Sequence, residues 1–364
     1  MPLSVVKAVQ YERDHRLYER RNLVHNGAMR VAQRGLGPTL IGGSGYFSAP
    51  DRWHLNKDAG HQIRVAQSTD APPGFTNSYS IENVTAISPT PATAYLILEH
   101  YMEGFNVQSL RKGTAAARPF VVSFWAKSGI PGTYILSVYD SDNHRHISRQ
   151  FAIEGVDTWE HFEIVFPADS TGTLNTGEGY SLRLRFWLAA GSNASSGTQA
   201  QVWRPYYAPN QAPEQVSFSA VAGATFRLSG VQMEPGDTAT NFIYEDYSQE
   251  LALCQRYYEQ SFEGTTPPGT AGTAGRTLIY AGGTTRSTGG TYIPFVVAKR
   301  KIPTVTIWSS NLNLNRVSDY GSSQAGERVP SVWPCKNGYS MYANGTTGAN
   351  VNLQFYWAAS AEAS

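Results

Sequence analysis

The sequence predicts an all-β protein, made of an antiparallel two-sheet sandwich, a short helix and a second, smaller β-domain. Three observations lead to this prediction. The chain contains 34 Gly and 20 Pro, which favour tight turns, and 12% of its residues are aromatic, which suits pleated sheets. Many short segments alternate apolar and polar side chains, as half-buried strands do. A length of 364 residues exceeds one ordinary core and suggests two or three domains.

Residues 1–21 are expected to form an arm or a marginal helix. The segment mixes acidic and basic side chains with scattered apolar ones, among them Val5, Val6, Val9 and Tyr11. These apolar residues are candidates for attachment to another protein or for contact between subunits. A frayed terminus explains the same pattern, and the sequence leaves both interpretations open. The apolar run is too short, and charges follow it too closely, for a signal peptide.

Residues 22–247 are predicted to form the sandwich. The clearest strand places Leu182, Leu184, Phe186 and Leu188 on one face and Ser181, Arg183, Arg185 and Trp187 on the other. The same alternation gives three further apolar faces: Phe120, Val122 and Phe124; Tyr134, Leu136 and Val138; Phe162, Ile164 and Phe166. A strand through Ile147, Arg149, Phe151 and Ile153 returns after a polar turn at 140–143. Repeated strands of this kind indicate two packed antiparallel sheets.

Residues 248–262 are predicted to form the short helix, with Asp246 or Ser248 as its N-cap. One apolar stripe follows from helical spacing: Tyr247, Leu251, Cys254 and Tyr258. Cys254 on this stripe is expected to be a buried small hydrophobe. With Cys335 as the second of only two cysteines, the chain has no disulfide framework.

Residues 263–364 are predicted to form the second β-domain. They begin with the Gly/Thr/Pro-rich linker GTTPPGTAGTAG, which packs poorly and should be exposed. Strands are expected at Thr277–Tyr280, Tyr292–Val297, Thr304–Trp308 and Leu353–Trp357. Three aromatic residues of this domain are weaker binding candidates, and we expect core packing for them: Trp308, Trp333 and Tyr339.

No catalytic constellation stands out. Hydrolysis of a glycosidic bond needs two carboxylates at a defined separation. The candidates are four acidic residues from one region: Glu154, Asp157, Glu160 and Glu163. Nothing forces two of them into one pocket, and solvated strand and turn positions explain them better. The nucleophile motif G-x-S-x-G and the zinc motif H-E-x-x-H are absent, so the sequence predicts no enzyme.

Two clusters offer incomplete metal sites. His144 and His146 share one face of a strand, but a zinc site needs at least three protein ligands. Asp140, Asp142 and Asn143 offer hard oxygens for Ca²⁺, although such residues are also typical of a hairpin turn. The sequence therefore predicts no metal and no cofactor.

A glycan-binding surface is better supported. Trp187 shares the polar face of its strand with Arg183 and Arg185. An indole can pack against the C–H face of a sugar while guanidinium groups meet its hydroxyls or carboxylates. Packing of Trp187 against another subunit or domain is the alternative, and we favour it.

The loop 202–215 adds Trp203, Tyr206 and Tyr207 in a Pro-stiffened setting. For these three aromatics glycan contact and interface packing remain equally open. Trp125 is expected to face away from Phe124 and is a further candidate.

Six separated segments resemble bacteriophage tail-fibre proteins. They are NLVHNGAMRVAQRG at Asn22–Gly35, APDRWHL at Ala49–Leu55, FVVSFWAKS at Phe120–Ser128, DTWEHFEIVFPADSTG at Asp157–Gly172, LAAGSN at Leu188–Asn193, and the segment Gly230–Tyr258. The resemblance implies that residues 22–247 form a jelly roll like that of carbohydrate-binding modules. It also implies a virion appendage, a homotrimer, and attachment of residues 1–21 to other virion proteins.

These features predict a tail-fibre-like phage virion protein that attaches to host surface glycans or another receptor. The alternative is a purely structural virion component, such as a head fibre, decoration or adaptor protein, and the absence of a shaft repeat favours it. A secreted carbohydrate-binding module fits less well because no signal peptide is recognised. A net charge of +1 argues against nucleic acid as a partner, and no run of about 18 apolar residues predicts membrane insertion. The protein is expected to be made in the host cytoplasm and to reside in the virion.

Overall fold

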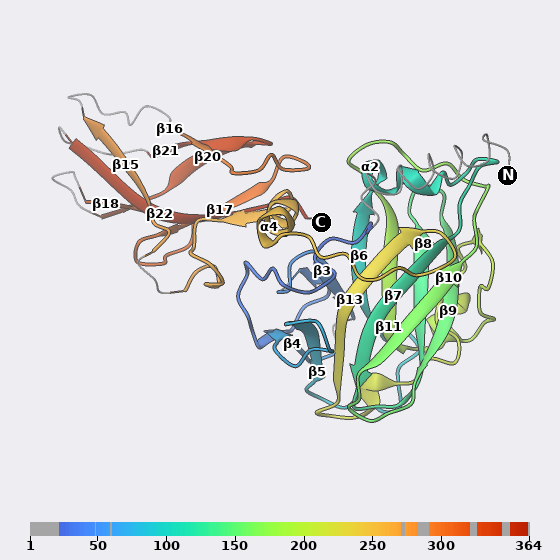
Figure 1. The fold of residues 1–364 in the computed structure, drawn as a ribbon. Coiled ribbons are helices and arrows are strands. Elements are labelled where there is room, and N and C mark those ends of the chain that lie inside the picture. The colour runs from blue at the N-terminus through green and yellow to red at the C-terminus, as the bar shows by residue number, and fades with distance from the viewer. Residues whose placement is uncertain are drawn as a thin grey trace.

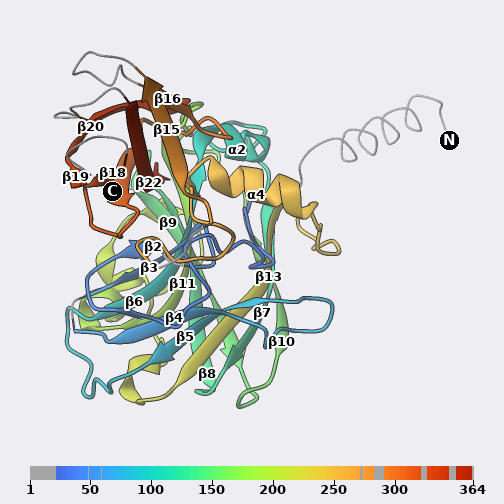
Figure 2. The same cartoon turned by 90° about the vertical axis from the view of Figure 1, so that its left-hand side faces the viewer.

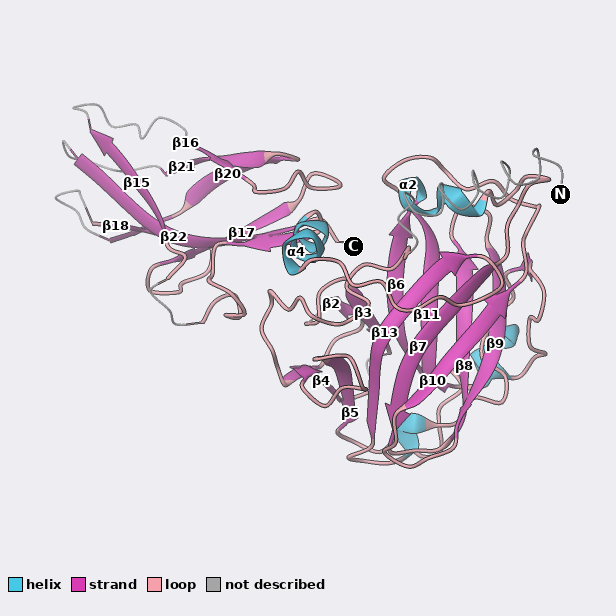
Figure 3. Cartoon of the chain, in the orientation of Figure 1, coloured by secondary structure: helices cyan, strands magenta, loops and turns pink. Residues whose placement is uncertain are grey.

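The chain folds into two β-rich parts that are joined at a short helix (Figures 1 and 3). The computed structural model describes residues 22–47, 49–58, 60–270, 274–282, 291–320, 326–343 and 350–362. Its strands pair antiparallel within four sheets, and its helices are short. The all-β prediction is therefore confirmed. The predicted arm, with Val5, Val6, Val9 and Tyr11, lies outside the described residues.

Two sheets form the sandwich. The first has the strand order β1 (Thr39–Ile41), β4 (Ile63–Ser68), β5 (Ser78–Asn83), β13 (Thr225–Pro235), β7 (Phe120–Ser128) and β10 (Glu160–Phe166). The second has the order β12 (Arg204–Pro205), β9 (Arg145–Ile153), β8 (Gly132–Asp140), β11 (Tyr180–Ala190), β6 (Tyr95–Glu103), β3 (Trp53–Lys57) and β2 (Tyr46–Phe47). Short helices occupy the connections: α2 (Gly104–Val107), η1 (Gln108–Leu110), α3 (Ser192–Ser195), η2 (Ala208–Asn210) and η3 (Phe218–Ala220).

The core between the two sheets follows the predicted alternation. The inward-facing residues of β11 are buried in it: Leu182, Leu184, Phe186 and Leu188. Phe124 of the first sheet meets Phe151 and Phe186 of the second, with ring centroids 5.0 Å apart in both pairs. Such interlocking rings hold the sheets together and leave the outer face of each sheet available for other contacts.

Helix α4 (Tyr247–Gln255) is shorter than the predicted helix at 248–262. The chain leaves the helix after Gln255, and Tyr258–Gln260 form strand β14, which pairs with residues 358–360. This long-range pairing outweighs the local helical pattern. Cys254 is buried as expected, and burial raises the pKa of its thiol. Tyr247 is exposed, so the predicted apolar stripe is only partly correct.

The second part is built around its longest strand, β22 (Asn350–Ser360). Four strands pair with it: β14, β15 (Thr277–Gly282), β17 (Thr304–Ser309) and β18 (Val317–Asp319). Strand β19 (Gly326–Arg328) extends this sheet, and a separate sheet has the order β16 (Thr291–Pro294), β21 (Gly338–Ala343) and β20 (Pro330–Cys335). One small core joins the two sheets. The four strands predicted here correspond to β15, β16, β17 and β22, whereas β18 to β21 were not predicted.

A buried arginine joins the two parts. Arg52 lies just before β3 in the sandwich and is 0% exposed. Its guanidinium donates to Glu362 Oε2 at 2.8 Å and to the carbonyl of Tyr101 at 2.7 Å, and it lies 3.3 Å from the centre of the Tyr257 ring. A buried charge is tolerated only where it is paired and hydrogen-bonded. Glu362 and Tyr257 belong to the C-terminal side of the junction between the two parts. That side therefore supplies the partners of a charge that is buried in the sandwich.

More polar contacts surround this arginine at the place where α4 lies between the two parts (Figures 1 and 2). Arg256 donates to both carboxylate oxygens of Glu103, at 3.0 and 2.8 Å, and the Tyr257 hydroxyl donates to the same carboxylate. Arg300 of the C-terminal part donates to the carbonyl of Glu178 in the sandwich at 2.6 Å. The junction is therefore a network of charges and not a flexible linker.

Three of the segments that carry the sequence resemblance meet at this junction. The backbone N–H of Asn26 donates to Glu250 Oε1 at 2.6 Å, and the Asn26 side chain donates to the carbonyl of Asp51 at 2.9 Å. Gln33 donates to the carbonyl of Tyr258, also at 2.9 Å. The segments at 22–35, 49–55 and 230–258 are thus far apart in the sequence and adjacent in space.

Replacing Glu362 by Gln should strongly destabilise the protein, because it leaves the Arg52 guanidinium buried without its counter-charge. We expect the free energy of unfolding to fall by about 3–5 kcal/mol in chemical denaturation. Glu82→Gln is the matched control, since the Glu82–Arg64 ion pair is exposed and should change stability by less than about 1 kcal/mol. Equal effects of the two substitutions would contradict the role assigned to Arg52.

Candidate functional site

The outer face of the seven-stranded sheet carries arginines packed against tyrosines. Because Leu182, Leu184 and Phe186 point into the core, Arg183 and Arg185 of β11 point outward, as predicted. The Arg183 guanidinium lies 4.9 Å from the centre of the Tyr101 ring and 5.6 Å from that of Tyr139. We call the surface formed by Tyr101, Tyr139, Arg183, Arg185 and Tyr206 the tyrosine–arginine face.

Arg185 is held in place by a buried carboxylate. Its Nε lies 2.7 Å from Glu99 Oε1, and Glu99 also accepts a hydrogen bond of 2.8 Å from the Tyr101 hydroxyl. Burial alone would raise the pKa of the Glu99 carboxyl, but Arg185, together with His54 and Tyr101, lowers it from 4.5 to about 2. Since Arg185 is buried and its charge is compensated, its part in the face is to position Tyr139, whose ring lies 4.5 Å from the guanidinium.

Arg183 differs from Arg185 in one important respect. Its Nε donates to the Ser141 hydroxyl at 3.2 Å, but within the described part of the chain its guanidinium has no carboxylate partner. The side chain is only half-buried. Arg183 therefore keeps donors available for an external hydroxyl or carboxylate, between two aromatic rings that restrict its motion.

Tyr206 completes the face from the loop 202–215. Its side chain is 45% exposed, and its ring meets the edge of Tyr139 with centroids 5.4 Å apart. His146 lies beneath it at 5.7 Å and is held by a hydrogen bond of 2.9 Å from Gln211. Tyr207 is also exposed, but none of the described residues makes a ring contact with it, so the structure does not bring Tyr207 into the face.

Trp187 and Trp203 do not contribute an exposed ring. Trp187 lies on the outer face as predicted, but its exposed fraction is 4% because Ala212 of the loop 202–215 and Ile97 and Ile135 of neighbouring strands cover it. Its indole N–H donates to the Ser137 hydroxyl at 3.0 Å. The favoured alternative, packing against another subunit or domain, is also wrong for this ring, because its own chain covers it.

Trp203 has an exposed fraction of 9% and belongs to the sandwich core. Its indole N–H donates to the carbonyl of Pro167 at 3.0 Å, and Lys112 lies 5.0 Å above its ring. Neither tryptophan offers a surface on which a sugar could stack, so both are removed from the candidate site.

Sequence reasoning missed Tyr139, Tyr101 and Glu99. The signal for Tyr139 was present, because it alternates with Tyr134, Leu136 and Val138 of one predicted strand and must face outward. Tyr101 and Glu99 lie on β6, a strand buried along most of its length, where alternation is hidden.

The acidic residues weighed for catalysis have structural roles or lie in solvent. Glu160 accepts hydrogen bonds from the backbone N–H groups of Glu154 and Gly155, at 3.0 and 2.8 Å, and so fixes the turn before β10. Asp157 and Glu163 are exposed. Among the described residues, no cluster of three or more His, Cys, Asp or Glu could hold a metal ion.

The two incomplete metal sites have other partners. Asp140 is buried, pairs with Lys112 at 2.5 Å and accepts the N–H groups of Asp142 and Asn143, both at 3.0 Å. The cluster thus forms a turn of the hairpin, held by hydrogen bonds. His144 is exposed, and its Nδ1 lies 2.9 Å from the Tyr139 hydroxyl.

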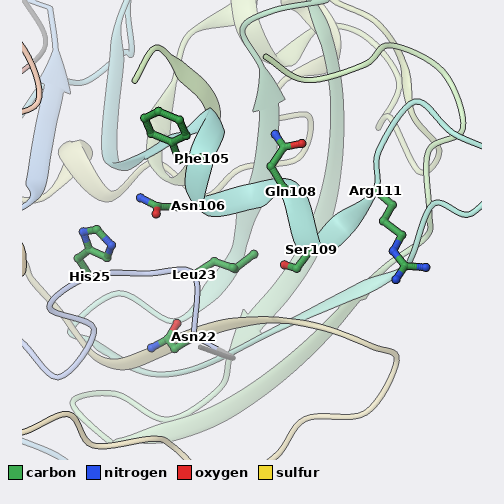
Figure 4. A pocket seen from close by; sticks show the side chains of 8 residues that line it. All are labelled: Asn22, Leu23, His25, Phe105, Asn106, Gln108, Ser109 and Arg111. Atoms are coloured by element: carbon green, nitrogen blue, oxygen red, sulfur yellow. The ribbon is translucent and has the colours of Figure 1, made fainter. Parts of the chain in front are cut away.

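A hollow of about 440 Å³ opens beside α2 and η1 (Figure 4). Side chains from residues 22–25 and 105–111 surround it, including Phe105, which is exposed. Gln108 already donates to the carbonyls of Gly104 and Asn175, both at 2.8 Å, and Asn22 donates to that of Val231 at 3.3 Å. We assign no ligand to this hollow.

None of the helices in the described ranges has the length and apolar character needed to span a bilayer.

The aromatic residues of the C-terminal part divide into two groups. Tyr339 is fully buried in the core, as expected, and Trp308 packs against Phe262 with ring centroids 5.5 Å apart. Trp333 is 57% exposed, so the expectation that it packs in the core is wrong. Its strand, β20, lies at the edge of a three-stranded sheet, where outward side chains meet solvent.

No protein-family model and no curated protein matches the sequence. Solved structures with low similarity include the enzymatically active domain of tailspike protein 4 from bacteriophage CBA120, at 12% identity and a TM-score of 0.31. The match covers 59% of this chain and 21% of the tailspike domain. A family 11 carbohydrate-binding module from Clostridium thermocellum matches at 12% identity and a TM-score of 0.29, over 58% of this chain and 99% of the module. A carbohydrate-binding module 61 solved with β-1,4-galactotriose matches at 10% identity and a TM-score of 0.30, over 59% of this chain and 99% of the module. At this level of similarity the matches assign no function.

The Glu99 carboxylate should make stability depend on pH. Because its pKa is lower in the folded state than its ordinary value of 4.5, the ionised form stabilises the fold above about pH 4.5. This contribution is lost as the pH falls toward 2. We therefore expect Glu99→Gln to lower the free energy of unfolding at pH 6 by about 3 kcal/mol, and by clearly less at pH 3.

Urea denaturation at the two pH values measures this difference, with the exposed Glu163→Gln as the control. An equal loss of stability at pH 6 and pH 3 would show that folding does not lower the pKa of the Glu99 carboxyl.

Proposed function

We propose that this protein is a bacteriophage virion fibre, similar to tail fibres, that attaches the particle to glycans on the host surface. The sequence resemblance in six segments supports the phage context. The observation that carries the binding function is Arg183, a guanidinium without a carboxylate partner among the described residues, held between Tyr101 and Tyr139 beside the exposed ring of Tyr206.

This arrangement suits a sugar that carries hydroxyl or carboxylate groups. The Tyr206 ring offers an apolar surface to the C–H face of the sugar, and Arg183 offers paired N–H donors to its oxygens. The glycan bound here is expected to be acidic or rich in hydroxyls. In a homotrimer three weak sites act together, because binding at one raises the effective concentration at the others.

The proposal includes the location and partners of the protein. Residues 1–21 attach it to other virion proteins, it is made in the host cytoplasm, and it acts by binding without catalysis. It uses neither nucleic acid nor a membrane as a partner.

A purely structural virion component, such as a head fibre, decoration or adaptor protein, is the second candidate. The burial of Trp187 and Trp203 favours it, because the two large rings first considered for sugar contact serve internal packing instead. A structural component requires no ligand at Arg183. A cell-binding assay therefore distinguishes the two candidate functions.

Arg183→Ala and Tyr206→Ala should each weaken binding of the purified protein to host-range bacterial cells and to glycan arrays by at least about tenfold. That effect corresponds to the loss of one charge-assisted hydrogen bond or one stacking contact. Tyr247→Ala is the matched control, since Tyr247 is an exposed tyrosine on α4 and not on the tyrosine–arginine face. A stable protein that binds no cell and no glycan would favour the structural component.

The protein should be a trimer in solution. Light scattering of the purified chain is then expected to give a mass of about 119 kDa, three times the 39.8 kDa of one chain. A mass near that of one chain at micromolar concentration would contradict the homotrimer.

A further inference from the structure

An aromatic groove opens on the other side of the sandwich, on the outer face of the six-stranded sheet. Its volume is about 380 Å³, within the range of about 300–1,000 Å³ that is common for ligand pockets. Residues of strands β7, β10 and β13, of the segment 239–244, and Phe75 line it. Figure 1 shows these three strands as neighbours in the sheet. Its rings belong to Phe75, Trp125, His161, Phe242 and Tyr244.

A backbone irregularity makes room for one group of rings. Strand β13 shifts its register against β7 between Ser229 and Gln232, and Gly230 in this bulge has φ +63°. A Cβ atom at Gly230 would lie 2.6 Å from Phe75, so only glycine allows this ring to rest on the backbone. Phe75 in turn packs against Phe242 and Tyr244, with ring centroids 5.0 and 5.4 Å away.

Trp125 and His161 form the second group. They are directly opposite each other on β7 and β10, with ring centroids 5.0 Å apart. Trp125 is half-buried, and within the described ranges its indole N–H has no hydrogen-bond partner. A free donor on a flat, partly exposed ring is what a sugar hydroxyl requires beside an apolar stacking surface.

The loop beside these rings is held in place before any ligand arrives. Glu234 is buried and accepts the backbone N–H of Thr240 at 2.8 Å, and Gln232 accepts that of Ile243 at 2.9 Å. Both bonds fix the segment that presents Asn241, Phe242 and Tyr244 to the groove. A rigid site loses less conformational freedom on binding and so binds more tightly.

The charges of the groove differ from those of the tyrosine–arginine face. Its lining contains one carboxylate, Glu163, and one imidazole, His161, but no arginine or lysine. A carboxylated sugar would bring a second negative charge beside Glu163, whose one basic neighbour in the lining, His161, already lies 3.8 Å from it. Hydroxyl groups, in contrast, can pair with Glu163, His161 and the exposed amide of Asn241.

We infer that the aromatic groove is a second glycan site, selective for neutral hexose oligosaccharides and separate from the tyrosine–arginine face. The inference rests on the proposed attachment to glycans and adds the class of sugar and its contacts. One sugar ring stacks on Trp125, while its hydroxyls bond with Glu163, His161 and Asn241.

The test follows the indole N–H resonance of Trp125 by NMR in the full-length protein, assigned with the Trp125→Phe variant. Neutral trisaccharides of glucose, galactose and mannose are titrated, with sialyllactose as the acidic probe. A neutral trisaccharide should shift this resonance saturably, with a dissociation constant on the order of 1 mM, and sialyllactose should bind at least about tenfold more weakly. Asn241→Ala should weaken the response several-fold, and Tyr206→Ala, on the other face, should leave it unchanged.

No shift with any neutral trisaccharide, or a stronger response to sialyllactose, would overturn the inference. Cell binding reports on the proposed function independently. A protein that binds cells through Arg183 but shows no response at Trp125 refutes the groove alone, whereas a response at Trp125 without cell binding refutes the fibre function alone.

Discussion

The buried guanidinium of Arg52 is the constraint on which the arrangement of the whole chain depends. It is stable only while Glu362, the Tyr101 carbonyl and the Tyr257 ring all surround it, and these groups come from both sides of the junction. The segments at 22–35, 49–55 and 230–258 contact one another close to this arginine. These contacts seat the second β-rich part on the sandwich independently of any ligand.

Local periodicity predicted the sandwich well, because strands such as β7, β8 and β11 show their inner and outer faces directly in the sequence. Contacts between distant segments were not predictable in this way. Alternation placed Trp187 on the outer face correctly but could not indicate that Ala212 covers it. The hairpin β20–β21 was missed because Pro330, Pro334 and Gly338 obscure its strands, although Asn337 followed by Gly338 is a typical turn signal.

The sandwich separates two kinds of surface on its two outer faces. On the seven-stranded sheet, a cation is stacked between phenol rings, and the carboxylate that could neutralise it is already bound to Arg185. On the six-stranded sheet, rings surround a groove whose lining includes no arginine or lysine. The two faces point in opposite directions, so one copy cannot press both against the same flat surface. Simultaneous use of both would require a branched or protruding glycan, or neighbouring copies in different orientations.

The position of β22 in the chain determines when the C-terminal part can assemble during synthesis. Strands β14, β15, β17 and β18 have only β22 as their common partner, and β22 follows all of them in the described part of the chain. On the ribosome the sandwich strands up to Pro235 have emerged long before it. Strands β14, β15 and β17 must therefore wait for their partner until Asn350–Ser360 leave the exit tunnel, and Glu362 reaches Arg52 only after that. The junction therefore closes only after Glu362 has emerged, and a product truncated before Asn350 would lack the charge that compensates Arg52.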